Sequence, residues 1–285
     1  MKIKNLREER FKIFKKAQEE KRAIFQFNFC DFSQLKGIIN AAKRFPYPFI
    51  LGTSEGESKY LGLETAVFLK KEAEKELKRS LILNLDHGKS LNYLKKAIET
   101  GYDMIHFDGS KLSLEKNIEL SKEIINYAKK RGVIIEGEIG VIRGSSKVHK
   151  ENVKIFQKDL SSPEEIERFI KEVDLDLLAV SIGNIHGIAQ KIPSLDFKRL
   201  SIIKNITRER GVLVLHGGSG IPISQIKKAI QKGIVKINLN TEIRLAWQQG
   251  WKKAFKKYPD EISPYKLAPI AIKEIERIVK KYIKL

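Results

Sequence analysis

The feature that most constrains the fold is a regular alternation of short apolar segments with longer amphipathic segments, repeated eight times along the chain. The short segments contain four to seven residues and are almost wholly apolar, which is typical of strands buried on both faces. The longer segments place apolar residues at i, i+3, i+4 and i+7, as a helix with one buried face does. Strands that alternate with helices predict parallel βαβ units, and eight such units predict a (β/α)8 TIM barrel.

These patterns give approximate bounds for each predicted element. The predicted strands comprise residues 24–29, 49–52, 81–85, 104–107, 133–139, 177–182, 212–215 and 234–239. The clearest predicted helices comprise residues 32–42, 61–77, 91–99, 114–128, 163–171, 197–206 and 223–231. Because no long linker or change of composition divides the chain, we predict one domain over residues 1–285, a barrel with extra N- and C-terminal helices.

Composition excludes several classes of protein. With 42% hydrophobic residues, the chain has enough apolar material for a large core, which excludes a wholly disordered protein. The single cysteine, Cys30, excludes an intrachain disulfide and any site that needs two thiolates of its own. No apolar run approaches the length of a membrane span, and residues 1–25 resemble a helix rather than a secretory signal. We therefore expect a cytoplasmic protein without a membrane partner.

The net charge of +20 raises the question of a nucleic-acid partner. The lysines are spread along the whole chain and alternate with glutamates, as in KKEAEKELKR at 70–79. Such alternation is typical of solvated helix faces, and no nucleic-acid-binding motif accompanies it. We therefore expect no nucleic-acid partner, and we expect the positive charge to attract small phosphorylated molecules.

Three of the five histidines share one sequence context. His87, His186 and His216 each follow a predicted strand and precede a glycine, whereas His106 lies within a strand and His149 lies in a charged loop. Because parallel strands end at one face of a barrel, these three imidazoles are expected to converge there. A single histidine at a strand end is more often a packed residue. Three histidines that bind one zinc ion and leave its fourth coordination position open are the ligand set of a catalytic zinc site. We expect barrel packing for His106 and a solvated position for His149.

Acidic residues occupy the same strand ends. Asp86 directly precedes His87, so a regular strand would point the two side chains apart, and a turn at Asp86 would bring both to the mouth. Asp86 is then a candidate acid or base, with a helix cap as the alternative. Glu136 and Glu138 share one face of the fifth predicted strand, where buried carboxylates need a partner or a metal. Asp108 ends the fourth strand, and its alternative role is also a helix cap.

The last two predicted strands end in segments suited to phosphate binding. HGGSG at 216–220 follows the seventh strand, and KINLNT at 236–241 ends the eighth. Glycines let a backbone approach a ligand closely, and helix N-termini offer free N–H groups. Barrels frequently bind phosphate at these two positions. A zinc ion could polarise the carbonyl of a phosphorylated ketose held there, while an aspartate exchanges a proton in retro-aldol cleavage.

Six ordered motifs resemble the class II, zinc-dependent fructose-bisphosphate and tagatose-bisphosphate aldolases. They are LNLDHG, DGSKLSLEKN, EGEIG, IGNIHG, LHGGSG and KINLNTEIR, and FNFCDFSQL and TSEGESKY resemble the same family at the first two strand ends. The resemblance covers about residues 24 to 250. It implies reversible cleavage of fructose 1,6-bisphosphate to dihydroxyacetone phosphate and glyceraldehyde 3-phosphate, a homodimer or homotetramer, and a monovalent cation, Na+ or K+, near the phosphate.

The resemblance also implies roles for individual residues. It assigns the catalytic zinc to three ligands, which are His87, His186 and His216. It assigns an alternative metal position to Glu138 and Asp108, proton exchange with the C4 hydroxyl to Asp86, and a substrate contact to Ser54. The residues implied to hold or line the site of the C1 phosphate are Gly187, Gly217, Ser219, Asn238, Asn240 and Thr241.

Two departures from the family pattern leave other substrates open. The loop after EGEIG has Ser145, Ser146 and Lys147 where the family carries acids, and Glu151 is the nearest carboxylate that could replace the family's base. The family's C-terminal Asp-Pro-Arg, which supplies an arginine to the far phosphate, is replaced here by ISPYKLAP, in which Lys266 lacks the guanidinium fork. The alternatives are therefore tagatose 1,6-bisphosphate, a ketose 1-phosphate without the second phosphate, or a metal-binding barrel without turnover.

Overall fold

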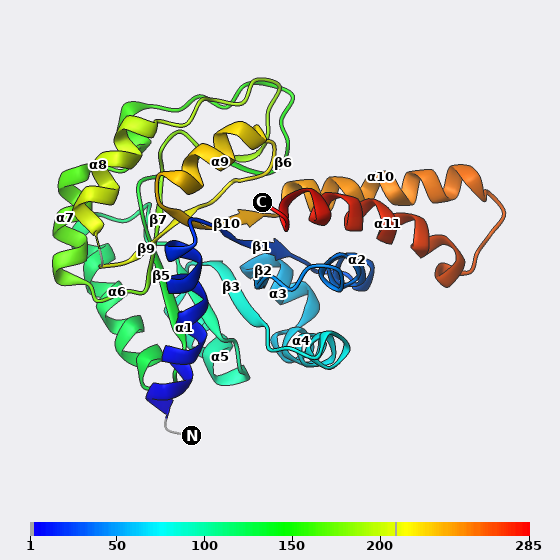
Figure 1. The fold of residues 1–285 in the computed structure, drawn as a ribbon, viewed down its shortest axis with the longest axis horizontal. Helices are drawn as coiled ribbons and strands as arrows, with labels where there is room; N and C mark the ends of the chain where they lie inside the picture. Colours follow the sequence, from blue (N-terminus) through cyan, green and yellow to red (C-terminus); the bar gives the residue numbers. More distant parts are fainter. Residues whose placement is uncertain (1–2, 209) are drawn as a thin grey trace.

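Eight parallel strands close into a barrel in the computed structural model, which describes residues 3–208 and 210–285. The strands are β1 (Ile24–Asn28), β2 (Phe49–Ser54), β3 (Ile82–Gly88), β4 (Met104–Phe107), β5 (Ile134–Ile139), β7 (Leu177–Val180), β9 (Val212–Leu215) and β10 (Ile234–Leu239). They pair in the order β1-β10-β9-β7-β5-β4-β3-β2, and Figure 1 shows helices on the outside. The predicted (β/α)8 barrel is confirmed.

The helices lie close to the predicted positions. They are α1 (Ile3–Glu19), α2 (Phe32–Ala42), α3 (Glu55–Leu61), α4 (Leu63–Leu77), α5 (Leu91–Thr100), α6 (Leu114–Lys129), α7 (Pro163–Glu172), α8 (Phe197–Thr207), α9 (Ile223–Gln231), α10 (Thr241–Lys257) and α11 (Pro264–Tyr282). The predicted start of the second helix at Leu61 was wrong, because Leu61 ends α3. Gly62 separates α3 from α4 with a φ of +88°, which glycine adopts without strain.

Helix α1 closes the end of the barrel at which the strands begin (Figure 1). Its Phe14 is fully buried in a cluster of residues at the starts of the strands, such as Ile24 of β1 and Ile134 of β5. An ion pair between Arg10 and Asp103 also ties α1 to the barrel. Because this end is filled, substrates can reach the barrel interior only from the end at which the strands finish.

A short second sheet lies outside the barrel and was not predicted. Strand β6 (Gly144–Val148) pairs in parallel with β8 (His186–Ile188). The ring Nε2 of His149 lies 2.9 Å from the backbone oxygen of His186, so the expectation that His149 is solvated was wrong. Strand β6 is exposed and polar, and it therefore lacks the apolar pattern that identified the barrel strands.

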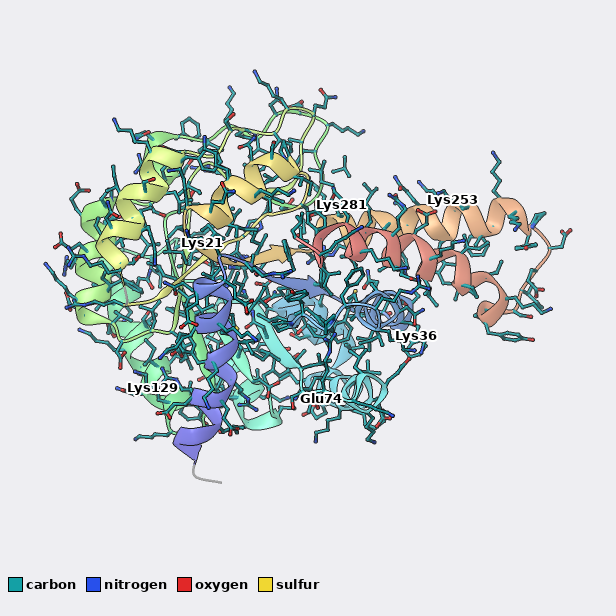
Figure 2. All side chains as sticks on the ribbon, in the orientation of Figure 1. Lys21, Lys36, Glu74, Lys129, Lys253 and Lys281 are labelled. Atoms are coloured by element: carbon teal, nitrogen blue, oxygen red, sulfur yellow. The ribbon has the colours of Figure 1, made fainter. Side chains whose placement is uncertain are left out.

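The charged side chains are distributed over many elements of the structure. Figure 2 shows labelled lysines on widely separated elements. Several lie in ion pairs, including Lys36 with Glu76 at 2.8 Å and Lys253 with Glu274 at 2.6 Å. Within residues 3–208 and 210–285, no helix combines the length and the apolar character that a membrane span requires.

Helices α10 and α11 form a hairpin that extends away from the barrel (Figure 1). The two helices approach closely at Gly250, where an added Cβ would lie 2.4 Å from Cα of Ala271. One turn further along α11, an added Cβ at Gly37 of α2 would lie 2.7 Å from Cβ of Ile275. These glycines allow the hairpin to pack against itself and against the barrel.

We expect Gly250→Ala to lower the free energy of unfolding by about 1–3 kcal/mol, because the new methyl group would overlap the α11 backbone. Thermal or chemical denaturation measures this loss. Gly56→Ala is the matched control, since an added Cβ there meets nothing within 4 Å. Equal stability of the two variants would contradict the close packing of α10 on α11.

Candidate active site and metal centre

One cavity at the open end of the barrel brings most of the predicted site residues together. It has a volume of about 40 Å³. The predicted residues that line it are Ser54, Asp86, His87, His186, Gly187, His216, Gly217, Ser219, Asn238, Asn240 and Thr241. Ser146 of β6 lines it as well, and sequence reasoning had not assigned that residue to the site. We call this space the catalytic cavity.

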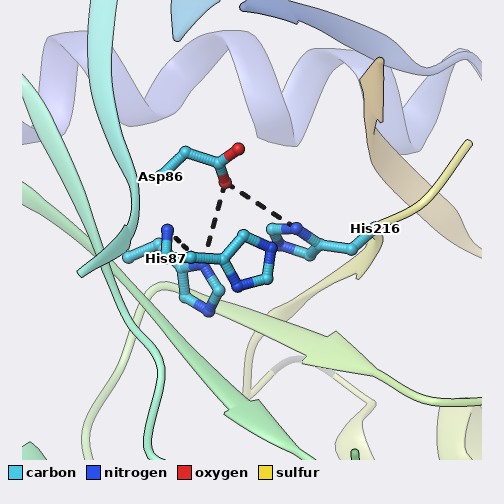
Figure 3. Close-up of side chains that lie close together, drawn as sticks. Asp86, His87 and His216 are labelled. Atoms are coloured by element: carbon cyan, nitrogen blue, oxygen red, sulfur yellow. Dashed lines mark hydrogen bonds and ion pairs between the residues drawn. The ribbon is translucent and has the colours of Figure 1, made fainter. Parts of the chain in front are cut away.

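Four imidazoles cluster at this cavity. The ring of His87 lies 4.6 Å from that of His186 and 4.5 Å from that of His216, between centroids. Figure 3 shows His87 and His216 converging beside Asp86. His106 lies inside the barrel, as expected, but its ring is also 4.7 Å from His87 and 4.6 Å from His216. Its position within a strand concealed this contact from the sequence analysis.

Asp86 and His87 reach the same cavity because β3 is irregular at this point. The pairing of β3 with β4 shifts register between Leu85 and Gly88. His87 adopts a φ of +52°, in the left-handed region that is strained for a residue with a Cβ. The turn that would aim both side chains at the mouth is therefore present.

Asp86 is buried and held between two amides. Asn28 and Asn238 each donate a hydrogen bond of 2.9 Å, one to each carboxylate oxygen. Burial would raise the pKa of Asp86, but the surrounding imidazoles and the Lys236 ammonium outweigh it and hold the pKa well below its usual range. Asp86 is thus an ionised carboxylate that can accept a proton. It does not cap the next helix, because Ser90 is the N-cap of α5.

Asp108 and Glu138 flank His87 on its other side. Nδ1 of His87 lies 3.1 Å from a carboxylate oxygen of Asp108 and 3.7 Å from one of Glu138. Burial would raise the pKa of Asp108, but the hydrogen bond with His87 outweighs it and lowers the pKa. Ser113, rather than Asp108, is the N-cap of α6.

Lys236 is a buried charge that the sequence analysis missed. It is fully buried, and its ammonium donates hydrogen bonds to Glu136 at 2.8 Å and to Asn238 at 2.7 Å. The other carboxylate oxygen of Glu136 lies 2.5 Å from Nε2 of His216. Since an ionised carboxylate only accepts, Nε2 of His216 carries the proton, and Nδ1, which lies 3.2 Å from the amide nitrogen of Asn238, carries the lone pair. A lysine within an otherwise apolar strand was the signal that could have revealed this pair.

The donor atoms of this cluster fit a bound metal ion. His87 Nε2, His106 Nε2 and Glu138 Oε2 are buried without a well-formed hydrogen bond among the described residues, and the last two atoms lie 3.2 Å from each other. Buried polar atoms are normally satisfied, so such atoms gathered at one place indicate a ligand. Two sets of donor atoms lie within 4.8 Å of one another, those of Asp86, His87, His106 and His216 and those of His87, Asp108 and Glu138.

The protonation states of two histidines also fit metal binding. Burial lowers the pKa of His216 and lowers that of His186 well below its usual range. Both imidazoles are therefore neutral, which is the form that binds metals. Imidazole nitrogens and carboxylate oxygens are the ligands that zinc prefers in catalytic sites.

The other side of the catalytic cavity is built from glycines and a helix N-terminus. Gly217 has a φ of +64°, and an added Cβ would lie 2.1 Å from the backbone oxygen of Ile185. Ser219 accepts a hydrogen bond from the Glu242 backbone N–H, and Thr241 begins α10. Free N–H groups and the helix dipole make such an N-terminus suitable for a phosphate.

Comparisons with known proteins decide the family. The sequence matches the family described as fructose-bisphosphate aldolase class-II over residues 9–285. The chain belongs to this family of class II aldolases. It is 35% identical to 6-phospho-5-dehydro-2-deoxy-D-gluconate aldolase of Bacillus licheniformis, over 94% of this chain and 90% of that relative. It is 34% identical to fructose-bisphosphate aldolase of Geobacillus stearothermophilus, over 87% of this chain and 85% of that relative.

A solved structure agrees with this assignment. The X-ray crystal structure of the YdjI aldolase from Escherichia coli K12 matches with a TM-score of 0.79 and 26% identity, over 96% of this chain and 95% of that one. The chain is therefore an aldolase, a lyase that breaks and forms carbon–carbon bonds. Class II aldolases are generally zinc-dependent, which agrees with the donor cluster.

Neither replacement considered for the family's missing residues lines the catalytic cavity of this aldolase. Glu151 is exposed beyond the end of β6, and Ser146 is the residue of that segment at the cavity. Lys266 lies in the first turn of α11, where its ammonium pairs with Glu261 at 2.8 Å.

Replacing Lys236 with Met is expected to lower the free energy of unfolding by about 3–5 kcal/mol, because Glu136 would stay buried without its cation. Chemical denaturation measures the loss. The double variant Lys236→Met/Glu136→Gln removes both charges and should recover part of the stability. A double variant that is less stable than Lys236→Met alone would show that the two charges do not neutralise each other.

Proposed function

We propose that this aldolase cleaves a phosphorylated ketose that carries a second anionic group, and that it releases dihydroxyacetone phosphate. The observation that supports this most is the position of Asp86, an ionised carboxylate that lines the catalytic cavity together with three imidazoles and two glycines. A ketose whose phosphate occupies the glycine-lined end places its carbonyl and hydroxyl near these groups. This arrangement suits retro-aldol chemistry.

We assign the metal to His87, His186 and His216, with Asp108 and Glu138 as the alternative position. The donor atom of His186 is in neither of the two close sets, so its ring must move toward His87 and His216 when the metal binds. When bound, a zinc ion supplies a Lewis acid that polarises the ketone of the substrate. Asp86 takes the proton from the hydroxyl on the far carbon of the bond to be broken. As the carbon–carbon bond breaks, that carbon becomes an aldehyde and the bonding electron pair passes toward the ketone. The net reaction returns one proton to the carbon left behind, which completes dihydroxyacetone phosphate. Asn28 and Asn238 hold Asp86 in place for this transfer.

The substrate must also displace part of the protein. A cavity of about 40 Å³ holds a few atoms, whereas pockets for small molecules are commonly about 300–1,000 Å³. Ser146 on β6 is the lining residue that belongs to an exposed strand outside the barrel. We therefore assign to β6 the role of a lid that moves when substrate enters.

Two substrates are the leading candidates. Fructose 1,6-bisphosphate is favoured by the motifs of the catalytic cavity and by the relative from Geobacillus stearothermophilus. 6-Phospho-5-dehydro-2-deoxy-D-gluconate is the second candidate, because the relative with that activity matches 94% of the chain. Each of these molecules has a phosphate at one end and another anion, a phosphate or a carboxylate, at the other. Tagatose 1,6-bisphosphate differs from the first only in stereochemistry at C4.

The first test is turnover of these three substrates by the purified, zinc-loaded protein, followed through coupled reduction of the dihydroxyacetone phosphate released. We expect cleavage of at least one, loss of cleavage after EDTA treatment and recovery on addition of zinc. The metal is needed because, in this proposal, it is the group that polarises the ketone. Tight zinc binding without cleavage of any of the three would contradict the proposal and would favour a barrel without turnover.

Asp86→Asn is expected to lower kcat by about 10²- to 10⁴-fold, because the amide cannot take the hydroxyl proton. Zinc content, measured on the same preparation, is expected to stay at the wild-type value, since the amide has almost the shape of the carboxylate. A variant that keeps its zinc and also keeps wild-type kcat would remove Asp86 from the catalytic role.

A further inference from the structure

The small sheet outside the barrel is irregular beside the catalytic cavity. Strand β6 pairs with β8 at Gly144, which lies opposite His186. The next pair is Val148 with Ile188, so residues 145–147 of β6 lie opposite a single residue of β8. Such an interruption breaks the regular pattern of hydrogen bonds between two strands, and the backbone groups within it need other partners.

The imidazole of His149, directly after β6, turns back into this interruption. Its Nε2 lies 2.9 Å from the backbone oxygen of His186 and 3.1 Å from that of Ser145. The backbone N–H of Ser145 also points to this nitrogen, but at 3.5 Å, which is longer than an ordinary hydrogen bond. Two close acceptors outweigh one distant donor, so Nε2 of His149 carries a proton and donates it to both oxygens.

Two glycines leave the space that this imidazole fills. Gly187 has a φ of +96°, and an added Cβ there would lie 2.5 Å from Nε2 of His149. Gly144 has a φ of +95°, and an added Cβ there would lie 3.2 Å from the same nitrogen. Glycine adopts both conformations without strain. A side chain at Gly187 would displace the ring, and one at Gly144 would crowd it.

His149 bonds the backbone of segments that line the catalytic cavity, although its own side chain lies outside that cavity. His186 and Gly187 of β8 and Ser146 of β6 all line it. The backbone N–H of His149 also donates to the Ile188 oxygen at 2.8 Å, which ties this residue to β8. When β6 moves away from the cavity, the imidazole must therefore lose its hydrogen bond to β6 or the one to His186.

We propose that His149 is a positioning residue that couples movement of the lid β6 to the metal ligand His186. This inference rests on the proposed function, which assigns His186 to the metal and gives β6 the role of a lid. The ring of His186 must move when the metal binds, and a backbone fixed by His149 reduces the conformational freedom that this step costs. Coupling is reciprocal, so a closed lid strengthens zinc binding and bound zinc keeps the lid closed.

The first test measures the zinc affinity of the whole chain by competition with a chromophoric chelator, without substrate. His149→Leu removes the donor, and we expect it to weaken zinc binding by about 10-fold. His149→Gln keeps an N–H donor at the end of its side chain and is expected to recover part of the affinity. Val148→Thr is the matched control, because Val148 is an exposed neighbour on β6 and threonine has nearly its shape.

The second test uses trypsin cleavage after Lys147, an exposed residue within β6, as the measure of lid opening. Zinc is expected to slow this cleavage by about 5-fold or more in the wild-type protein and in Val148→Thr. In His149→Leu we expect fast cleavage that zinc does not slow, because the connection between β6 and His186 is lost. Mass spectrometry of the peptides measures the rate at this bond, and circular dichroism checks that each variant is folded.

A merely structural role for His149 predicts a different result. His149→Leu would then speed cleavage equally with and without zinc and would leave zinc affinity unchanged, which would overturn the coupling. Wild-type cleavage that zinc does not slow would overturn it as well.

His186→Ala separates failure of this inference from failure of the proposed metal site. We expect this variant to bind zinc more weakly than His149→Leu does, because it loses a ligand outright. Wild-type zinc affinity in His186→Ala would refute the metal assignment, and the coupling with it. Weak zinc binding in His186→Ala but wild-type affinity in His149→Leu would refute the coupling alone. These measurements need no turnover, so an incorrect choice of substrate does not affect them.

Discussion

The active site depends on one buried ion pair, that between Lys236 and Glu136 inside the barrel. Either charge alone would be costly to bury, so each makes the other possible. Glu136 in turn contacts Nε2 of His216, and Lys236 donates to Asn238, which itself holds Asp86. The orientation of a proposed metal ligand, His216, and that of the proposed base are therefore set by the same pair of charges, and packing alone could not orient these polar groups.

The sequence predicts the barrel well because burial on both faces leaves its strands almost uniformly apolar. Helices with one buried face are equally clear, and the predicted bounds of α2 and α9 agree with the structure at both ends. Strand β6 could not be predicted, because pairing with β8 rather than burial keeps it extended. Gly62 divides a continuous helical pattern through its backbone conformation, which apolar spacing does not report.

In the candidate site too, features that follow from the order of residues could be predicted, and features that depend on local backbone geometry could not. The sequence could predict that His87, His186 and His216 lie at one end of the barrel, because each follows a strand and precedes a glycine. The sequence could not predict that the side chains of Asp86 and His87 reach the same cavity, since this depends on a register shift and a strained φ at His87. The role of Lys236 was missed because the sequence does not show that Glu136, its partner on another strand, faces it inside the barrel.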